Sequence, residues 1–231
     1  MRLDQQLHQC LGISRSPASL FLRAGRITVN GTTVKSGSLH VNEQDVILFD
    51  DDSLQTPGEN LYYFMLHKPQ GYVCANADAN HPSITQLFDL PRADELHAAG
   101  RLDVDTTGLV LVTNDGQWSH RVTSPRKQCE KIYRVWLAEA ISDETRKQFA
   151  EGILLRSETQ PTHPAQLEIV TPREVLLTIH EGKYHQVKRM FAAVGNHVER
   201  LHREQIGALA LDANLPEGDF RALTAKEISL F

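Results

Sequence analysis

The sequence predicts an α+β protein with two domains, a small α/β domain over residues 1–58 and a larger, mainly antiparallel-sheet domain over residues 59–231. Before residue 40, apolar residues recur at helical spacing and then form a hairpin pattern. After residue 60, short apolar runs separated by turn residues outnumber helical stretches, which favours a sheet. Chain-breaking residues around Gly58 separate these two patterns and predict the domain boundary.

The composition is that of a globular protein. Of 231 residues, 41% are hydrophobic and 23% are charged, which excludes disordered and fibrous classes. No apolar run approaches the roughly 18 residues of a membrane span, and the first residues lack the apolar core of a secretory signal. The three cysteines are widely spaced and form neither a disulfide framework nor a metal motif. We expect a soluble, cytoplasmic monomer with reduced thiols.

The charges are unevenly distributed along the chain. The net charge is -5, with 24 Lys and Arg against 29 Asp and Glu, which argues against a protein that coats nucleic acid through bulk positive charge. Residues 2–35 nevertheless carry five cations and one anion, a net +4, whereas residues 36–60 carry six anions and no cation. A local basic face followed by an acidic linker is the simplest interpretation.

The first domain should contain two short helices and a hairpin. Helical spacing of apolar residues predicts one helix that ends at Gly12 and a second that begins at the N-cap Ser14 and ends at Gly25. The second helix would carry Arg15 and Arg23 on its outer side. Residues 26–29 and 32–34 flank Asn30-Gly31, which supplies the positive φ angles of a type I′ turn.

The second domain should contain six strands and four helical segments. The expected strands are 62–66, 109–112, 132–137, 167–170, 175–179 and 198–201. The expected helices are 118–122, 142–151, 186–194 closed by Gly195, and a C-terminal turn with the capping box Thr224-x-x-Glu227.

The N-terminal segment resembles the S4 RNA-binding module. The resemblance is carried by Arg2-Leu3-Asp4, Leu11-Gly12, Ser14-Arg15 and the run from Arg23 to Gly31. From residue spacing alone, a basic helix face is most often only solvated. The resemblance implies an RNA-facing role for a set of four cations, Arg15, Arg23, Arg26 and Lys35, which would contact the phosphate backbone without reading its sequence.

Three polar groups interrupt the apolar pattern of the second domain. Asp103 and Asp105 lie on one face of extended chain, a spacing that suits an inverting glycosidase pair, a Mg²⁺ site or simple turn chemistry. Residues 181–190 place a loop before a helix with adjacent cations, which favours anions at that helix start. Tyr133 lies on a strand that should bury its ring, and a core tyrosine is the structural alternative to a functional one.

The order of four motifs resembles the pseudouridine synthases. The motifs are Lys68-Pro69-Gln70-Gly71, Gly100-Arg101-Leu102-Asp103, Lys131-Ile132-Tyr133 and His185-Gln186-Val187-Lys188-Arg189-Met190. Residues 116–121 and 123–126 fit the RsuA type, which acts on small-subunit (16S) ribosomal RNA, better than its large-subunit relatives. The resemblance therefore implies a uridine-to-pseudouridine isomerase whose partner is small-subunit ribosomal RNA or the assembling subunit.

The resemblance also implies residue roles. Asp103 matches the essential carboxylate, which must be ionised and therefore needs a fixed cation nearby. Lys188 matches the position of that cation, where many relatives have Arg. The adjacent Arg189 is expected to contact the RNA, as is Arg101. Tyr133 matches the aromatic that stacks on the target base, and Arg101 could refill the stack after the nucleotide is flipped out.

The isomerisation is redox neutral, so neither a cofactor nor a metal is expected, and Asp105 is assigned to the loop. Three alternatives remain open. They are a large-subunit enzyme of the same family, a non-catalytic S4-type ribosome-assembly factor, and a hydrolase that uses Asp103 and Asp105 to release free uracil.

Overall fold

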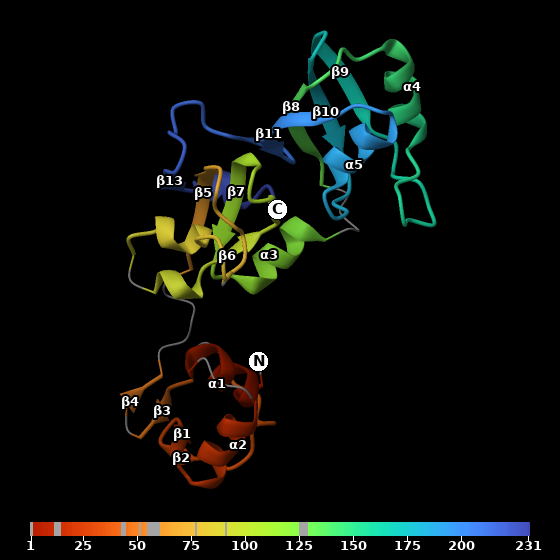
Figure 1. Cartoon of the computed structure of the whole chain (residues 1–231). Helices are drawn as coiled ribbons and strands as arrows, with labels where there is room; N and C mark the ends of the chain where they lie inside the picture. Colours follow the sequence, from red (N-terminus) through yellow and green to blue (C-terminus); the bar gives the residue numbers. More distant parts are fainter. Residues whose placement is uncertain are drawn as a thin grey trace. The chain divides into compact units, whose positions relative to one another are not determined.

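The computed structural model describes residues 2–11, 15–42, 45–50, 52–54, 61–76, 78–90, 92–124 and 129–231. The chain forms two compact units, Met1–Leu61 and Tyr62–Phe231 (Figure 1). The expected boundary residue Gly58, the expected C-cap Gly12 and the expected N-cap Ser14 lie outside the described residues.

The N-terminal unit has the expected helices and hairpin. Helices α1 (Leu3–Leu11) and α2 (Arg15–Arg23) pack on a sheet of order β2-β1-β3-β4, whose strands are Thr32–Thr33, Ile27–Val29, Ile47–Phe49 and Asp52–Ser53. Leu3, Leu7 and Ala18 are completely buried in the shared core. Asn30 and Gly31 have φ angles of 50° and 77°, which confirms the predicted turn.

The C-terminal unit is built on a nine-stranded sheet, with the order β13-β5-β7-β11-β8-β10-β9 along its main path. The pairs are antiparallel except for β7 with β11, so the predicted mainly antiparallel sheet is confirmed. These strands are β13 (Phe220–Ala222), β5 (Tyr63–Lys68), β7 (Thr107–Thr113), β11 (Val198–Ile206), β8 (Lys131–Leu137), β10 (Glu174–Ile179) and β9 (Gln166–Thr171). Two short strands, β6 (His97–Ala99) and β12 (Leu209–Ala210), pair with β7 and β11.

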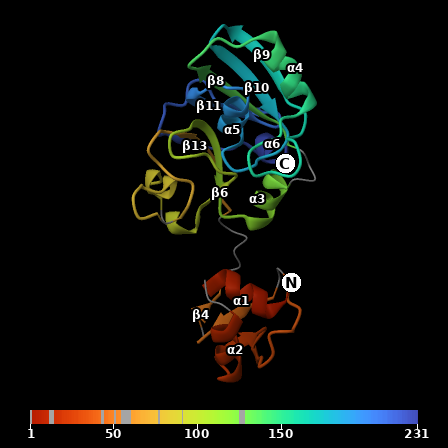
Figure 2. The ribbon, with the colours of Figure 1, turned by 45° about the vertical axis from the view of Figure 1, so that its right-hand side comes forward.

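Strand β7 lies between two hydrophobic cores, and all seven of its residues are therefore buried. Val110 and Val112 face the larger core, to which α4 (Asp143–Glu151) and α5 (Gln186–Ala193) contribute aromatic and aliphatic side chains. Leu109 and Leu111 face the smaller core under α3 (Gly116–Thr123) and α6 (Ala225–Ile228), which lie near each other in Figure 2. A strand covered on both faces reads as a continuous apolar run, as the sequence does here.

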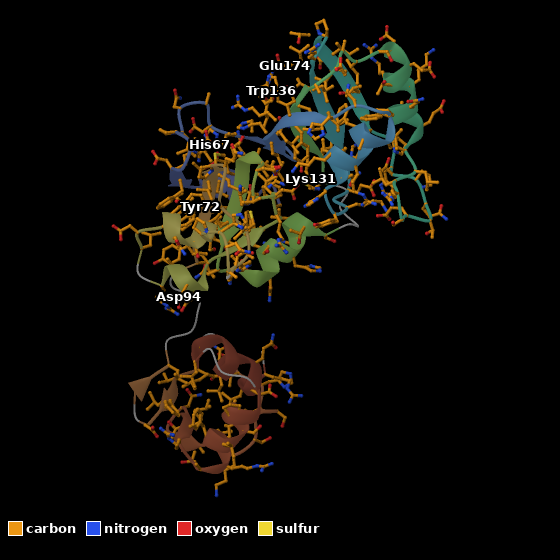
Figure 3. All side chains as sticks on the ribbon, viewed as in Figure 1. His67, Tyr72, Asp94, Lys131, Trp136 and Glu174 are labelled. Carbon is orange, nitrogen blue, oxygen red and sulfur yellow. The ribbon has the colours of Figure 1, made fainter. Side chains whose placement is uncertain are left out.

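The antiparallel register fixes which residues of β8 meet those of β10. Glu174 lies opposite Trp136, and Ile179 lies opposite Lys131 at the other end of the pair. Figure 3 shows Trp136 and Glu174 together and Lys131 well away from them. The alternation buries Tyr133 and Val135 of β8 towards the larger core, as the sequence predicted for the tyrosine ring.

The predicted helices of this unit are confirmed, and so is the capping box of α6, in which Thr224 and Glu227 exchange hydrogen bonds. Hydrogen bonds from Arg221 lower the pKa of Glu227 to about 2. Strands β6, β12 and β13 were not predicted, because they are only two or three residues long. Among the described residues, no helix is long and apolar enough to cross a membrane.

Candidate active site

A loop between β6 and β7 carries Asp103, and the buried side chain of Lys68 holds that loop in place. Its ammonium Nζ donates to the carbonyl oxygens of Pro69 at 3.0 Å and Thr106 at 2.8 Å. Lys68 is completely buried, and this burial lowers its pKa. The backbone N–H of Gly71 donates to the carbonyl of Val104 at 2.7 Å. The motif Lys68-Pro69-Gln70-Gly71 therefore supports the loop that contains the motif Gly100-Arg101-Leu102-Asp103.

Lys188 of α5 joins two carboxylates. Its Nζ lies 3.0 Å from Oδ2 of Asp103 and 2.5 Å from Oδ1 of Asp105. Desolvation opposes the charge on Lys188, but hydrogen bonds and Coulomb attraction from both carboxylates raise its pKa above the ordinary value. Desolvation also opposes the charge on Asp105, and Lys188 outweighs it, so the pKa of Asp105 is lowered. The sequence assigned Asp105 to the loop, and the structure adds that it shares the cation.

His185 is a neighbour of Asp103 to which sequence reasoning assigned no separate role. Its ring Nε2 lies 3.5 Å from Oδ1 of Asp103, and the backbone of His185 is left-handed, with a φ of 46°. This conformation at the N-cap of α5 turns the loop so that both His185 and Lys188 face the carboxylate. Positive φ at a non-glycine residue is uncommon and clusters at functional sites.

Arg203 is a site residue that the sequence analysis did not single out. It is 2% exposed and lies opposite Tyr133 in the β8–β11 register. Its Nη1 lies 3.4 Å from the phenol oxygen of Tyr133, and its guanidinium carbon lies 5.9 Å from the ring centroid. Since a guanidinium only donates hydrogen bonds, it uses a lone pair of the phenol oxygen and leaves the O–H proton for another acceptor.

Arg203 also ties the start of the Asp103 loop to β7, the strand that follows the loop. Its Nε donates to the carbonyl of Leu109 at 2.8 Å, and its Nη1 lies 3.5 Å from the carbonyl of Arg101. Gly108 allows this approach, since a Cβ there would lie 2.3 Å from the carbonyl oxygen of Arg203. The one signal in the sequence that could have identified Arg203 is its position on a strand, where a cation takes a place that should be buried.

The other predicted RNA-binding residues lie in different settings. Arg101, Arg23 and Lys35 are exposed, and Arg15 lies in α2. Arg26 is held by Asp50 in an ion pair and lies over the rings of Phe21 and Phe49.

The guanidinium of Arg189 contacts other residues of the C-terminal unit. It pairs with Glu158 at 3.2 Å and donates to the carbonyls of Tyr184 at 3.1 Å and Arg156 at 2.6 Å. Within the described ranges, no cluster of three or more His, Cys, Asp or Glu side chains could hold a metal ion.

The arrangement supplies a carboxylate with a fixed counter-charge, in a loop that Arg203 links to a buried aromatic ring. The side chain of Asp103 is 28% exposed, so it is reachable from solvent while it pairs with Lys188. Tyr133 reaches the same loop through Arg203. Such a site can use its carboxylate as a nucleophile or as a base.

Comparisons with known proteins identify both units. Residues 1–47 match the S4 domain family, and residues 62–193 match the RNA pseudouridylate synthase family. A crystal structure described as a pseudouridylate synthase is 53% identical, with a TM-score of 0.74 and complete coverage of both chains.

Curated relatives match over nearly the whole chain. A ribosomal small subunit pseudouridine synthase A from Yersinia pestis is 55% identical over 99% of this chain and 97% of its own length. The proteins of the same name from Escherichia coli (strain K12) and Haemophilus influenzae are 53% and 54% identical over 99% of this chain, and the matches cover 99% and 98% of those proteins. The chain therefore belongs to the RNA pseudouridylate synthase family and, within it, to the group of the ribosomal small subunit pseudouridine synthases A.

Proposed function

We propose that this chain isomerises one uridine of small-subunit ribosomal RNA to pseudouridine, with Asp103 as the carboxylate that begins the reaction. The observation that carries the assignment of Asp103 is its ion pair with Lys188, in a loop that Lys68 supports. Arg203 links this loop to Tyr133. Full-length similarity to small-subunit enzymes supports the choice of RNA.

The reaction breaks the N1–C1′ bond of uridine, turns the uracil without releasing it, and joins C5 to C1′. An ionised Asp103 can attack the sugar carbon, add to the base, or remove the C2′ proton, and each role needs a negative oxygen at the reacting centre. Lys188 places a positive charge 3.0 Å from that carboxylate, and this attraction strengthens when a flat apolar base displaces water.

The target nucleotide must leave its helix to reach Asp103, at a cost of a few kcal/mol. Arg101 is two residues from Asp103 and exposed, so its planar guanidinium is the proposed group that fills the vacated stack. The ring of Tyr133 is the proposed surface for the uracil, since Arg203 contacts both the Tyr133 phenol and the loop that carries Asp103.

The first test maps pseudouridine in ribosomal RNA from cells that lack the gene. One uridine of the small-subunit RNA should lose its modification and regain it when the wild-type gene is restored. Loss in large-subunit RNA would overturn the assignment of the substrate. Chromatography of RNA digested after reaction with purified protein distinguishes the alternatives, because pseudouridine, unchanged uridine and an abasic site indicate an isomerase, a binding factor and a hydrolase.

The ring of Tyr133 should matter more than its hydroxyl. Tyr133→Ala removes the stacking surface, worth about 1–3 kcal/mol per base, so kcat/KM should fall up to about 100-fold. Tyr133→Phe keeps the ring and loses one hydrogen bond of about 1 kcal/mol, so the fall should be about fivefold. Steady-state kinetics on the mapped RNA measures both. Equal losses would show that the phenol oxygen, not the ring, carries the contribution.

The N-terminal unit should supply affinity through phosphate contacts. Neither Arg23 nor Lys35 forms an ion pair with a described residue, whereas Arg26 is already paired with Asp50. Replacing Arg23 and Lys35 with Gln should reduce the slope of log affinity against log salt by roughly 1.5, at about 0.7–0.9 per phosphate. Arg26→Gln should change the slope less.

Titration of labelled RNA at several salt concentrations measures this slope, and single-turnover rates at saturating RNA should stay near the wild-type value. A normal slope with a collapsed rate would mean that the N-terminal unit shapes the active site. The proposed partners are small-subunit RNA or the assembling subunit, and the proposed working form is a monomer in the cytoplasm.

A further inference from the structure

Next to Asp103 lies an aromatic pair that the proposed reaction does not use. The rings of Tyr184 and His185 stack with centroids 3.8 Å apart and planes inclined by 19°. The His185 ring contacts Asp103 at 3.5 Å, so Tyr184, His185 and Asp103 form a continuous row. Tyr184 is 76% exposed, the largest fraction of any large apolar side chain in the part of the chain that the structure describes.

We propose that the Tyr184–His185 pair is a stacking platform for the RNA base adjacent to the flipped uridine. This inference rests on the proposed function. One side of the Tyr184 ring is covered by His185 and the rest of the ring is in solvent. Extrusion of a uridine leaves its neighbour with an unstacked face, and stacking on an aromatic side chain returns about 1–3 kcal/mol of the cost.

The position of the platform selects the adjacent nucleotide as its occupant. A uridine whose C1′ is at Asp103 places the next nucleotide of its strand within one backbone repeat of that carboxylate. His185 spans that interval, since its ring contacts Asp103 at its edge and Tyr184 at its face.

The charges of the loop favour a base over a phosphate. Lys183 and Arg189 lie on either side of Tyr184 in the sequence, but both are paired with Glu158, at 3.1 Å and 3.2 Å. An anion would have to compete with Glu158 for these cations. The group left available at the surface of the loop is the flat face of Tyr184, which binds any base through its π surface.

The loop is also held in advance of binding. Arg189 Nη1 donates to the carbonyl of Tyr184, and the backbone N–H of Lys183 donates to Oε1 of Gln186 at 2.8 Å. Gln186 is 4% exposed and donates in turn to Glu181 at 2.8 Å. A platform fixed in this way loses little conformational entropy when a base stacks on it. Arg189 therefore has a structural role, because it holds the backbone of Tyr184 in place.

The test combines protein variants with modified RNA in binding measurements. The full-length protein carries Asp103→Asn so that the RNA is not converted, and the probe is the small-subunit RNA fragment that contains the mapped uridine. Tyr184→Leu, which keeps apolar bulk without a flat ring, should weaken binding about 5- to 100-fold, whereas Tyr184→Phe should bind like the parent. Thermal unfolding of the Leu variant should match the parent, because the side chain is exposed.

Abasic substitution on each side of the uridine identifies the stacked base. At one neighbouring position, the abasic RNA should bind the parent as weakly as normal RNA binds Tyr184→Leu, and combining both changes should cost nothing more. A 2-aminopurine at that position should be quenched by the parent and not by Tyr184→Leu. Additive losses at both positions, or full affinity of Tyr184→Leu, would overturn the platform.

These outcomes are separable from failure of the proposed function. If the wild-type protein isomerises the RNA but the losses in the binding cycle are additive, the platform proposal is rejected and the proposed function stands. If the wild-type protein forms no pseudouridine, the proposed function is rejected, whatever the result of the binding cycle.

Discussion

Asp103→Asn should abolish turnover while RNA affinity stays the same or improves. The substitution keeps the shape of the side chain and removes the negative oxygen that each possible role of Asp103 requires. The expected loss in single-turnover rate is about 10³-fold or more. Affinity should not fall, because a carboxylate repels RNA phosphates and the amide does not. Pseudouridine formation and equilibrium binding of the same RNA measure the two quantities.

Asp105→Asn is the matched control for Asp103→Asn, since both carboxylates contact the same ammonium. It should retain substantial activity, because Lys188 keeps its hydrogen bond to Asp103. Equal losses in both variants would indicate a carboxylate pair and revive the hydrolase alternative, which release of free uracil would then demonstrate.

Lys188→Met should reduce the single-turnover rate about 10²-fold, the usual effect of removing one preorganised electrostatic partner. Two carboxylates that shared one cation would then face each other, which favours protonation of one of them. Lys188→Arg should stay within about tenfold of the wild type, because it keeps the charge and offers a fork to both carboxylates.

The double variant Lys188→Met with Asp105→Asn tests this explanation. If repulsion from Asp105 contributes to the loss, its removal should restore about tenfold in rate relative to Lys188→Met alone. A rate that falls further would show that Asp105 assists the reaction directly. In the wild type, Lys188 has a raised pKa, so its contribution should persist as pH rises and be lost only above the ordinary lysine range.

Local features of the fold followed from the sequence because their causes are local. The helix α1 follows from apolar residues spaced for one face, and the hairpin of β1 and β2 follows from Asn30-Gly31. The capping box of α6 is a four-residue pattern, and it forms as predicted. Strand β6 was missed because its three residues, His97 to Ala99, have too little alternation to exceed the background of turns.

The active-site residues were accessible to sequence reasoning only through ordered motifs. Spacing alone left Asp103 and Asp105 with several interpretations, and the resemblance to pseudouridine synthases is what selected Asp103. Resemblance also gave Lys188 its role. The resemblance could not show that Lys68 supports the loop or that Arg189 holds the backbone of Tyr184. Both side chains donate hydrogen bonds to backbone carbonyl oxygens, and a motif of side chains does not reveal such contacts.

The sequence by itself predicted the helices, the longer strands, a two-domain organisation and the candidates for catalysis. Tertiary structure decided which side chains meet at the site. Asp103 and Lys188 are 85 residues apart, and Tyr133 and Arg203 are 70 residues apart. Their contacts depend on the insertion of β11 between β7 and β8 and on its register with both strands. Strand order and register are set by packing across the whole sheet, so no local periodicity in this chain could reveal them.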